Sequence, residues 1–178
     1  MPRSKVNTSP IPERFVWAAA LLQHSPVENI LEIGCGVGLL VAQVAKTLTT
    51  GRLYAIDQSP SRLAKARKRN RRFIEEGKLY LEEVGFMEAD LPQFFFHRIV
   101  AFNVNTFFQE PRQELAKIKT LLHPTGKLFL FYQAPFEIDA DAAGPLVKNL
   151  EKNDFAILEI EWKQLNPTSA ICVIGKSI

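Results

Sequence analysis

Residues 30–38 read ILEIGCGVG, a short and mostly apolar run that passes directly into three glycines at alternate positions. The run has the composition of a buried strand, and the glycines allow the chain to turn tightly and to pass close to a ligand. Residues 39–48 then place apolar side chains near a 3.6-residue period, which predicts a helix whose first amide groups point at the same turn. The stretch therefore predicts a ligand site between a strand and a helix.

A carboxylate follows at the end of the next predicted strand. The run YAID, residues 54–57, places Asp57 where the carboxyl end of a neighbouring parallel strand lies beside the glycine turn. An acid at that point is suited to accept both hydroxyls of a ribose. The alternative is structural, because Asp57 precedes Ser59-Pro60 and is also suited to cap a helix or form an Asx turn there. One carboxylate could serve both roles.

The rest of the chain alternates strands with helices. We predict strands at 29–33, 52–56, 78–84, 98–104, 127–132, 155–163 and 169–176, helices at 12–22, 39–48, 59–74, 111–122 and 140–153, and a turn at 123–126. Continuously apolar strands separated by helices indicate a parallel sheet covered on both faces. The last two strands have no helix between them. The prediction is a doubly wound α/β fold with a mostly parallel seven-stranded sheet and a C-terminal antiparallel hairpin.

Composition and length fit one domain, which we place at residues 12–178 after a flexible N-terminal arm at residues 1–11. The 178 residues are 47% hydrophobic and 23% charged, values that exclude a disordered chain. The longest apolar runs have the length of strands, so we expect no membrane span, and residues 1–12 lack a secretory signal. The two cysteines, Cys35 and Cys172, match no metal-ligand spacing. We therefore expect no metal and a cytoplasmic location.

The positive charge is concentrated in one predicted helix. Residues 62–72 carry seven basic side chains and no acid, so the rest of the chain is net negative although the whole has a charge of +3. Seven cations could attract nucleic acid. However, no aromatic residues are interleaved with them, and an apolar stripe accounts for the inward face of the helix. We therefore interpret this segment as a solvated helix face and do not expect a nucleic-acid partner.

The sequence resembles class I S-adenosylmethionine-dependent methyltransferases over residues 12–178. The resemblance rests on ILEIGCGVG, on YAID, on Leu91-Pro92 before the fourth strand, on NVNTFF at 103–108, on HPTGKL at 123–128, and on the closing hairpin. Glu32 before the glycines, and the G-x-G-x-G spacing, favour this family over nicotinamide-dependent dehydrogenases, which have G-x-G-x-x-G. The resemblance implies a Rossmann-like fold, S-adenosylmethionine as cofactor and S-adenosylhomocysteine as product.

The resemblance also implies where the cofactor binds. Glu32 and the turn residues Gly34, Cys35 and Gly36 would hold its amino-acid end, Asp57 would bind the ribose, and Gln58 would flank the adenine. The family often has Gly-Asp-Ala after the third strand, where this sequence has Phe86-Met87-Glu88. Phe86 and Met87 would then sandwich the adenine ring by apolar contact.

The methyl acceptor should bind beyond the fourth strand. There Asn103 would bond the cofactor's carboxylate-bearing end or the acceptor, and Phe107 and Phe108 would form the pocket wall, unless these two residues belong to the core. Residues 15–22 are the candidate lid, with Trp17 pointing to the pocket. Val104 stands where a proline would mark enzymes that methylate amide or base nitrogens.

No side chain is identified as a catalytic base. His97 enters the fourth strand from the end away from the ligand, and methyl transfer from a sulfonium is able to proceed by positioning and desolvation alone. Because the predicted elements leave little chain for recognising a large substrate, we predict a small-molecule acceptor. The alternative is a non-catalytic module of the same fold that binds the cofactor or acts as a scaffold.

Overall fold

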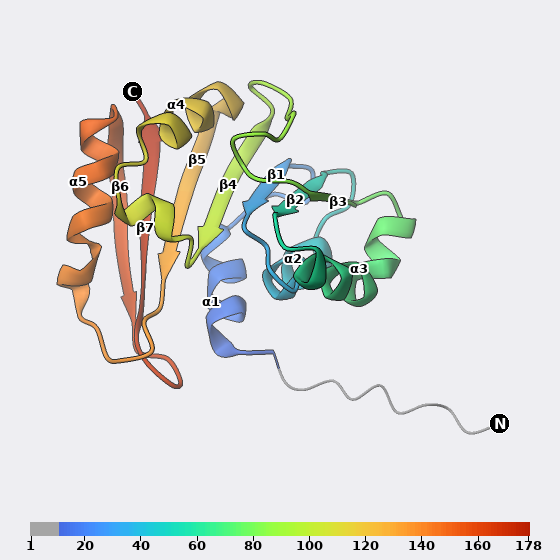
Figure 1. Cartoon of the computed structure of the whole chain (residues 1–178), viewed down its shortest axis with the longest axis horizontal. Coiled ribbons are helices and arrows are strands. Elements are labelled where there is room, and N and C mark those ends of the chain that lie inside the picture. The colour runs from blue at the N-terminus through green and yellow to red at the C-terminus, as the bar shows by residue number, and fades with distance from the viewer. Residues whose placement is uncertain (1–10) are drawn as a thin grey trace.

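Seven strands form one mixed sheet in the computed structural model, which describes residues 11–178 (Figure 1). The arm predicted at residues 1–11 therefore lies outside the described residues, except for Ile11. The sheet order is β3-β2-β1-β4-β5-β7-β6. The strands are β1 Ile30–Ile33, β2 Leu53–Asp57, β3 Leu79–Glu83, β4 Phe96–Phe102, β5 Leu122–Tyr132, β6 Phe155–Lys163 and β7 Ala170–Ser177.

The strand pairing confirms the predicted sheet. β1 pairs in parallel with β2 and β4, β3 pairs in parallel with β2, and β5 pairs in parallel with β4. β7 lies between β5 and β6 and is antiparallel to both. The chain order reverses between β1 and β4, and this switch point is where open α/β sheets bind ligands, beyond the carboxyl ends of the strands.

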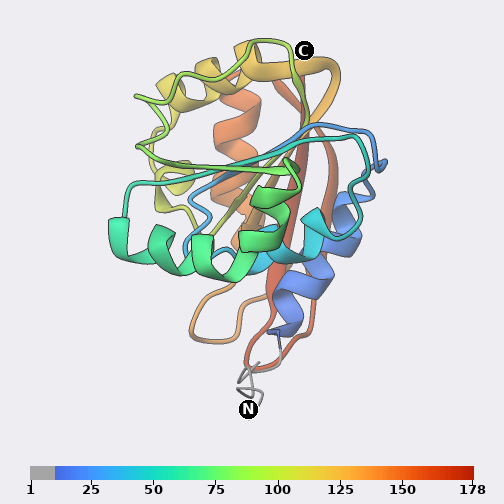
Figure 2. The same ribbon diagram turned by 90° about the vertical axis from the view of Figure 1, so that its right-hand side faces the viewer.

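Helices cover both faces of the sheet (Figure 1 and Figure 2). One core packs α1, α2 and α3 against the strands, and the other packs α4, α5 and a short 3₁₀ turn, η1. The bounds are α1 Glu13–Leu22, α2 Leu39–Ala45, α3 Pro60–Glu75, η1 Asn105–Phe108, α4 Arg112–Leu121, η2 Ala140–Ala143 and α5 Gly144–Lys152. Two separate cores, one on each face, are what continuously apolar parallel strands require.

Several predicted boundaries differ from the structure, and three of the differences have a clear structural form. β4 begins at Phe96 and ends at Phe102, two residues earlier than predicted at each end. The predicted turn at 123–126 lies inside β5, because Phe96 pairs with Leu122 whereas Arg98 pairs with Lys127, so the intervening residues of β5 bulge out of the ladder. The helix predicted at 140–153 begins as the 3₁₀ turn η2 and becomes α-helical only from Gly144.

Two histidines stack at the amino edge of the sheet, which lies opposite the switch point. The rings of His97 and His123 have centroids 4.4 Å apart, and His97 Nδ1 accepts a hydrogen bond from the backbone N–H of Asn29 at 3.2 Å. Burial and the neighbouring His123 both lower the pKa of His97. The position agrees with the expectation that His97 lies away from the ligand.

This histidine pair predicts a loss of stability in acid. A folded-state pKa below the unfolded value means that the unfolded chain binds more protons, so the free energy of unfolding falls as the pH drops below about 6.5. We expect His97→Gln to lose less stability than the parent between pH 7.5 and 5.5, as measured by urea unfolding at several pH values. Equal pH dependence in the two proteins would contradict this account.

Candidate active site

Three glycines with positive φ form the turn between β1 and α2, and two of them also lack space for a side chain. The φ values are +71° for Gly34, +54° for Gly36 and +71° for Gly38. A Cβ on Gly34 would lie 2.9 Å from Val104 Cγ2, and one on Gly38 would lie 2.6 Å from Asn70 Nδ2. Nothing lies within 4 Å of a Cβ on Gly36. The turn is therefore packed at both ends and open in the middle.

The basic helix α3 holds this turn in place. Asn70 is buried, and its Nδ2 donates to the carbonyl oxygens of Gly38 and Ala66, each at 3.0 Å. The Arg69 guanidinium donates to the carbonyl of Val37 in the turn. A helix that the sequence indicates only as a solvated basic face thus also positions the candidate ligand site.

Alanine substitutions in the glycines should separate packing from ligand contact. Gly38→Ala combines a left-handed φ with a clash against α3, so we expect a loss of about 2–4 kcal/mol in the free energy of unfolding. Gly36→Ala and the matched control Gly77→Ala, whose φ is +66° and whose Cβ would also meet nothing, should each lose only about 1 kcal/mol. Of these last two, only Gly36→Ala should weaken cofactor binding, as measured by calorimetry. Equal affinities in the two variants would place the cofactor elsewhere.

Asp57 is nearly buried at the end of β2, with 6% of its surface exposed. Its Oδ2 accepts the backbone N–H of Gly36 at 2.8 Å, and its Oδ1 accepts the backbone N–H of Ser59 at 2.8 Å. The second bond is the Asx turn that the sequence offered as the structural alternative. The first bond joins the carboxylate to the open part of the glycine turn, so one side chain connects β2, the turn and the start of α3.

A cavity of about 560 Å³ opens at the carboxyl ends of β1, β2 and β4. Five predicted site residues line it, namely Gly34, Asp57, Gln58, Phe86 and Asn103. A smaller recess of about 180 Å³ shares Gln58 and Phe86 with this cavity and adds Met87 and Phe107. The cavity therefore lies at the predicted switch point and brings together residues from four separate loops.

Glu32 is a buried acid with an unsatisfied oxygen. It lies in β1 just before the turn, is 3% exposed, and its Oε2 has no hydrogen-bond partner among the described residues. Burial raises the pKa of Glu32 to about 8, an effect opposed by a backbone hydrogen bond from Val41 and reinforced by the charge of Asp57. A buried acid without a partner for one oxygen is suited to pair with a positively charged group of a ligand.

Asn103 and Cys35 have structural roles in the absence of a ligand. Asn103, at φ +54°, donates from Nδ2 to the carbonyl of Gln133 at 3.0 Å and accepts the Gln133 N–H at 2.8 Å, which ties the ends of β4 and β5 together.

Cys35 is 6% exposed, and burial raises the pKa of its thiol. Both cysteines are unpaired and buried. A buried thiol of raised pKa is a poor nucleophile, as expected for a small filler of the turn.

The three aromatic residues predicted for the acceptor pocket do not converge on the cofactor cavity. Trp17 is 8% exposed and packs edge-on against Phe131 in the core, with ring centroids 5.3 Å apart, so its predicted place in the pocket is corrected. Phe107 is 2% exposed and reaches only the recess. Phe108 packs on Tyr132, with ring centroids 4.6 Å apart, and faces a different groove. Core packing, the alternative given for Phe107 and Phe108, accounts for most of Phe107, and it also accounts for Trp17, for which the sequence suggested only the pocket.

Three charged residues that the sequence did not single out as ligands lie at the site. Arg62, in the first turn of α3, lines the cavity, and Glu88 and Glu114 line the recess. The Glu88 carboxylate occupies the space where Gly85 would carry a Cβ. In the sequence, Gly85 follows the third strand and precedes the acid Glu88 by three residues, and this pattern could have indicated Glu88 as a site residue. Glu114 comes from α4, so only the three-dimensional fold brings it here.

The fold and the site define a class of protein. A glycine turn after β1, an acid at the end of β2, a cavity at the switch point and an antiparallel C-terminal strand pair together are typical of Rossmann-like methyltransferases. Residues 31–128 match the family model described as a methyltransferase domain, and the chain belongs to this family. It is an S-adenosylmethionine-dependent methyltransferase.

The similarity to known proteins covers most of the chain. An uncharacterized methyltransferase of Bacillus subtilis (strain 168), YdaC, is 24% identical over 166 residues, which cover 90% of this chain and 89% of the relative. A crystal structure of an S-adenosylmethionine-dependent methyltransferase from Aquifex aeolicus has a TM-score of 0.72 at 16% identity, covering 94% of this chain and 89% of that one. A geranyl diphosphate methyltransferase in complex with S-adenosylmethionine has a TM-score of 0.73 at 7% identity, covering 93% and 85%. These two structures share the fold.

Within residues 11–178, no helix has both the length and the apolar character needed to cross a membrane.

Proposed function

We propose that this enzyme transfers the methyl group of S-adenosylmethionine to a small-molecule acceptor. The observation that carries the proposal is the cavity at the switch point, which Asp57 and Gly34 line. The buried carboxylate of Glu32, whose Oε2 has no partner among the described residues, lies in β1 two residues before Gly34. For a small acceptor, the basic helix provides further support. Four of its seven cations are already engaged within the chain, by backbone carbonyls of Val37 and Leu81 or by acids one turn away, which leaves fewer free for nucleic acid.

Each part of the cofactor has residues that would bind it. The ammonium of its amino-acid portion would pair with Glu32, and the open space at Gly36 would admit the same portion against the turn. Asp57 would accept the ribose hydroxyls on lone pairs that the backbone bonds leave free. The adenine would enter the recess between Phe86 and Met87, where Glu88 and Glu114 are available to accept hydrogen bonds from its exocyclic amine.

S-adenosylmethionine, when bound, supplies a methyl group on a positively charged sulfur. The chain's own contribution is then to orient the acceptor and to exclude water, because an in-line displacement needs no protein base if the acceptor is already nucleophilic. None of the three histidines lines the cavity. We further propose a cytoplasmic location, which the two buried and unpaired cysteines support.

Calorimetry with S-adenosylhomocysteine tests the cofactor site, and transfer of a labelled methyl group to a panel of small acceptors tests the reaction. We expect binding in the micromolar range, about 8 kcal/mol, and label on at least one small acceptor. Binding without transfer to any acceptor would favour the non-catalytic module instead. Transfer to RNA or to protein alone would overturn the proposed acceptor class.

A further inference from the structure

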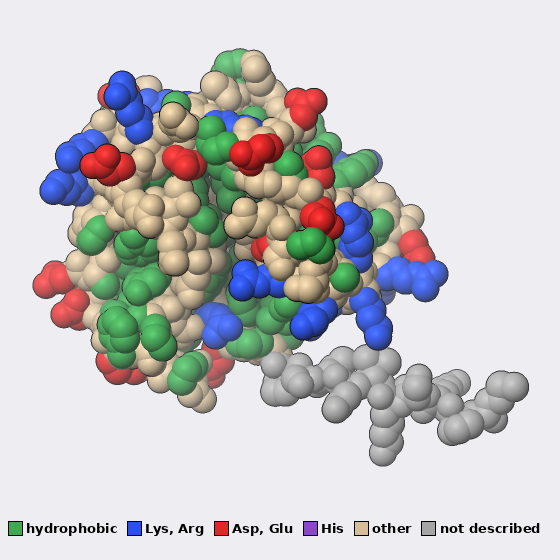
Figure 3. All heavy atoms as spheres, viewed as in Figure 1, with side chains coloured by type: hydrophobic (Ala, Val, Ile, Leu, Met, Phe, Trp, Pro, Cys, Tyr) green, Lys and Arg blue, Asp and Glu red, His purple; other side chains and the backbone are tan. Residues whose placement is uncertain are grey.

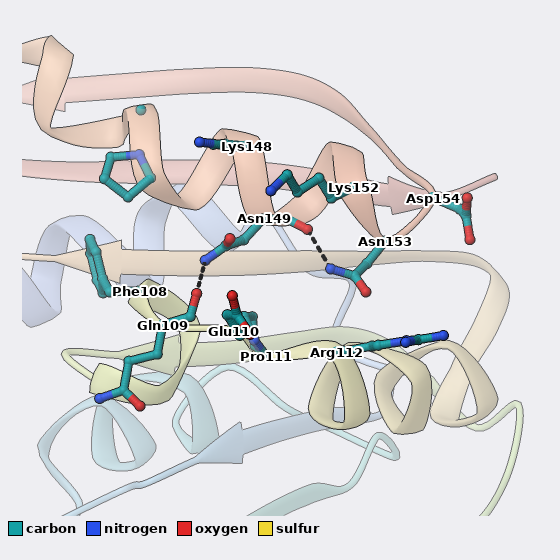
Figure 4. Close-up of a pocket in the computed structure, with 12 residues that line it drawn as sticks. Phe108, Gln109, Glu110, Pro111, Arg112, Lys148, Asn149, Lys152, Asn153 and Asp154 are labelled. Atoms are coloured by element: carbon teal, nitrogen blue, oxygen red, sulfur yellow. Dashed lines mark hydrogen bonds between the residues drawn. The ribbon is translucent and has the colours of Figure 1, made fainter.

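A second groove lies beside the cofactor cavity, between α5 and the segment that leads into α4 (Figure 4). Its volume is about 810 Å³, larger than the 560 Å³ of the cofactor cavity. Residues 108–112 form one wall, and α5 with the residues that follow it forms the other. Apart from Phe108 at one end, no residue of the predicted cofactor and acceptor sites lines this groove.

The groove has an excess of unpaired cations. Arg112, Lys148 and Lys152 line it, and none of the three forms an ion pair among the described residues. Of its two acids, Asp154 is paired with Lys119, the Oδ2–Nζ distance being 2.8 Å, which leaves Glu110 alone. Lys148 and Lys152 are one helical turn apart and so share a face of α5. Figure 4 shows both lysines on α5 and Arg112 on the opposite wall, and Figure 3 shows Lys and Arg side chains, interspersed with Asp and Glu, near the upper end of α5.

Side-chain hydrogen bonds hold the two walls together. Asn149 Nδ2 donates to the carbonyl oxygens of Phe107 and Gln109 on the opposite wall, each at 2.9 Å. Within the α5 wall, Asn153 Nδ2 donates to the carbonyl of Asn149 at 2.8 Å. The amide of Asn149 therefore fixes the chain after η1 against α5. Cations held on two fixed walls bind a multiply charged anion with less loss of side-chain freedom than cations on mobile loops do.

The groove and the cofactor cavity share one short turn. Asn105 and Thr106 of η1 line the cofactor cavity, and Phe108 and Gln109, which follow directly, line the groove. The start of α5 at Gly144 lies at the same edge of the sheet, and Lys148 and Lys152 lie about one and two turns further along, roughly 6 and 12 Å. A molecule with its reactive end at the cofactor could therefore extend along this groove.

We propose that the groove binds a phosphate or diphosphate group of the methyl acceptor. The inference rests on the proposed function, because it assigns the acceptor to the same reaction. Three cations opposed by one carboxylate match a multiply charged anion better than a single carboxylate group, and guanidinium and ammonium groups are the usual protein ligands of phosphate.

Pyrophosphate is the probe for the first test, with the full chain observed by ¹H–¹⁵N correlation spectra. We expect shifts of the Asn149 side-chain amide and of residues 109–112, and binding that weakens as salt is added. The double variant Lys148→Gln/Lys152→Gln should bind about 100-fold more weakly, or about tenfold for each charge-assisted hydrogen bond removed. The matched control Lys163→Gln/Lys176→Gln, on β6 and β7, should keep the parent affinity. Absence of shifts in the parent, or shifts that persist in the first variant, would overturn the site.

The second test links the groove to the reaction. Labelled methyl transfer is measured on pairs of acceptors that differ only in a phosphate group. We expect the phosphorylated member to be methylated, with a KM raised in Lys148→Gln/Lys152→Gln and unchanged in the control. Transfer to the unphosphorylated member alone would overturn the link. S-adenosylhomocysteine binding, measured on the same proteins, should be equal in all of them. If the parent fails to bind it, the proposed function fails, whereas the pyrophosphate result still decides whether the groove binds anions.

Discussion

Asp57→Ala is expected to weaken S-adenosylhomocysteine binding by about 30- to 1000-fold, or roughly 2–4 kcal/mol. If Asp57 accepts both ribose hydroxyls, the substitution removes two charge-assisted hydrogen bonds, each worth about 1.5–3 kcal/mol before allowance for non-additivity. Isothermal titration calorimetry measures the loss. A role confined to the turn would instead cost folding stability and leave the affinity of the folded protein nearly unchanged.

The structure adds a second effect of this substitution. Both oxygens of Asp57 accept backbone N–H groups, from Gly36 and from Ser59, so Asp57→Ala should also lower the free energy of unfolding by about 1–3 kcal/mol. Gly77→Ala is a suitable control, because it carries a moderate stability loss at a site remote from the cavity and should bind the cofactor normally.

Asparagine at position 57 gives the sharper comparison for the ribose assignment. Asparagine has nearly the same size as aspartate but only one acceptor oxygen, whereas two backbone N–H groups donate to Asp57. The substitution should therefore remove the negative charge and also lower the free energy of unfolding. If Asp57→Asn binds S-adenosylhomocysteine as tightly as the parent, the carboxylate does not hold the ribose.

Local patterns predicted the fold because each of them has a direct physical cause. The run before Gly34 is buried on both faces of the sheet, and the missing helix between the last two strands forces an antiparallel pair. The predicted turn at 123–126 failed for the opposite reason. Its sequence is typical of a turn, but pairing of Leu122 with Phe96 in the neighbouring strand keeps it within β5 as a bulge.

The site was predictable where a residue lies in the glycine turn or follows the carboxyl end of a parallel strand. Gly34 and Asp57 line the cavity as expected because the carboxyl ends of parallel strands meet at one edge. The prediction for Trp17 treats its helix as a lid over the pocket, whereas in the structure the indole ring is buried and packs edge-on against Phe131 in the core. Glu114 was missed because α4 comes near the site only through the packing of the whole sheet.

Glu32 should make both the stability and the cofactor affinity depend on pH, because it is buried beside the turn with an unsatisfied Oε2. Its pKa of about 8 in the folded protein lies above the reference value of 4.5, so the folded protein holds a proton that the unfolded chain releases over this range. The free energy of unfolding without ligand should therefore fall as the pH rises from about 5 to about 8, the reverse of the trend expected from His97. Glu32→Gln, which does not ionise, should remove this part of the dependence.

Cofactor binding should show the opposite trend, since the ammonium of the cofactor's amino-acid portion favours the ionised carboxylate. Binding to the parent below pH 8 should release a proton, and the affinity for S-adenosylhomocysteine should rise by up to about tenfold per pH unit until it levels off near pH 8. Glu32→Gln should bind about 10- to 100-fold more weakly at pH 8, because a charge-assisted hydrogen bond worth about 1.5–3 kcal/mol is lost. Calorimetry at pH 6.5 in two buffers of different ionisation enthalpy counts the released proton directly. A parent that releases no proton, or a variant with the parent's pH profile, would show that Glu32 does not face the cofactor's ammonium.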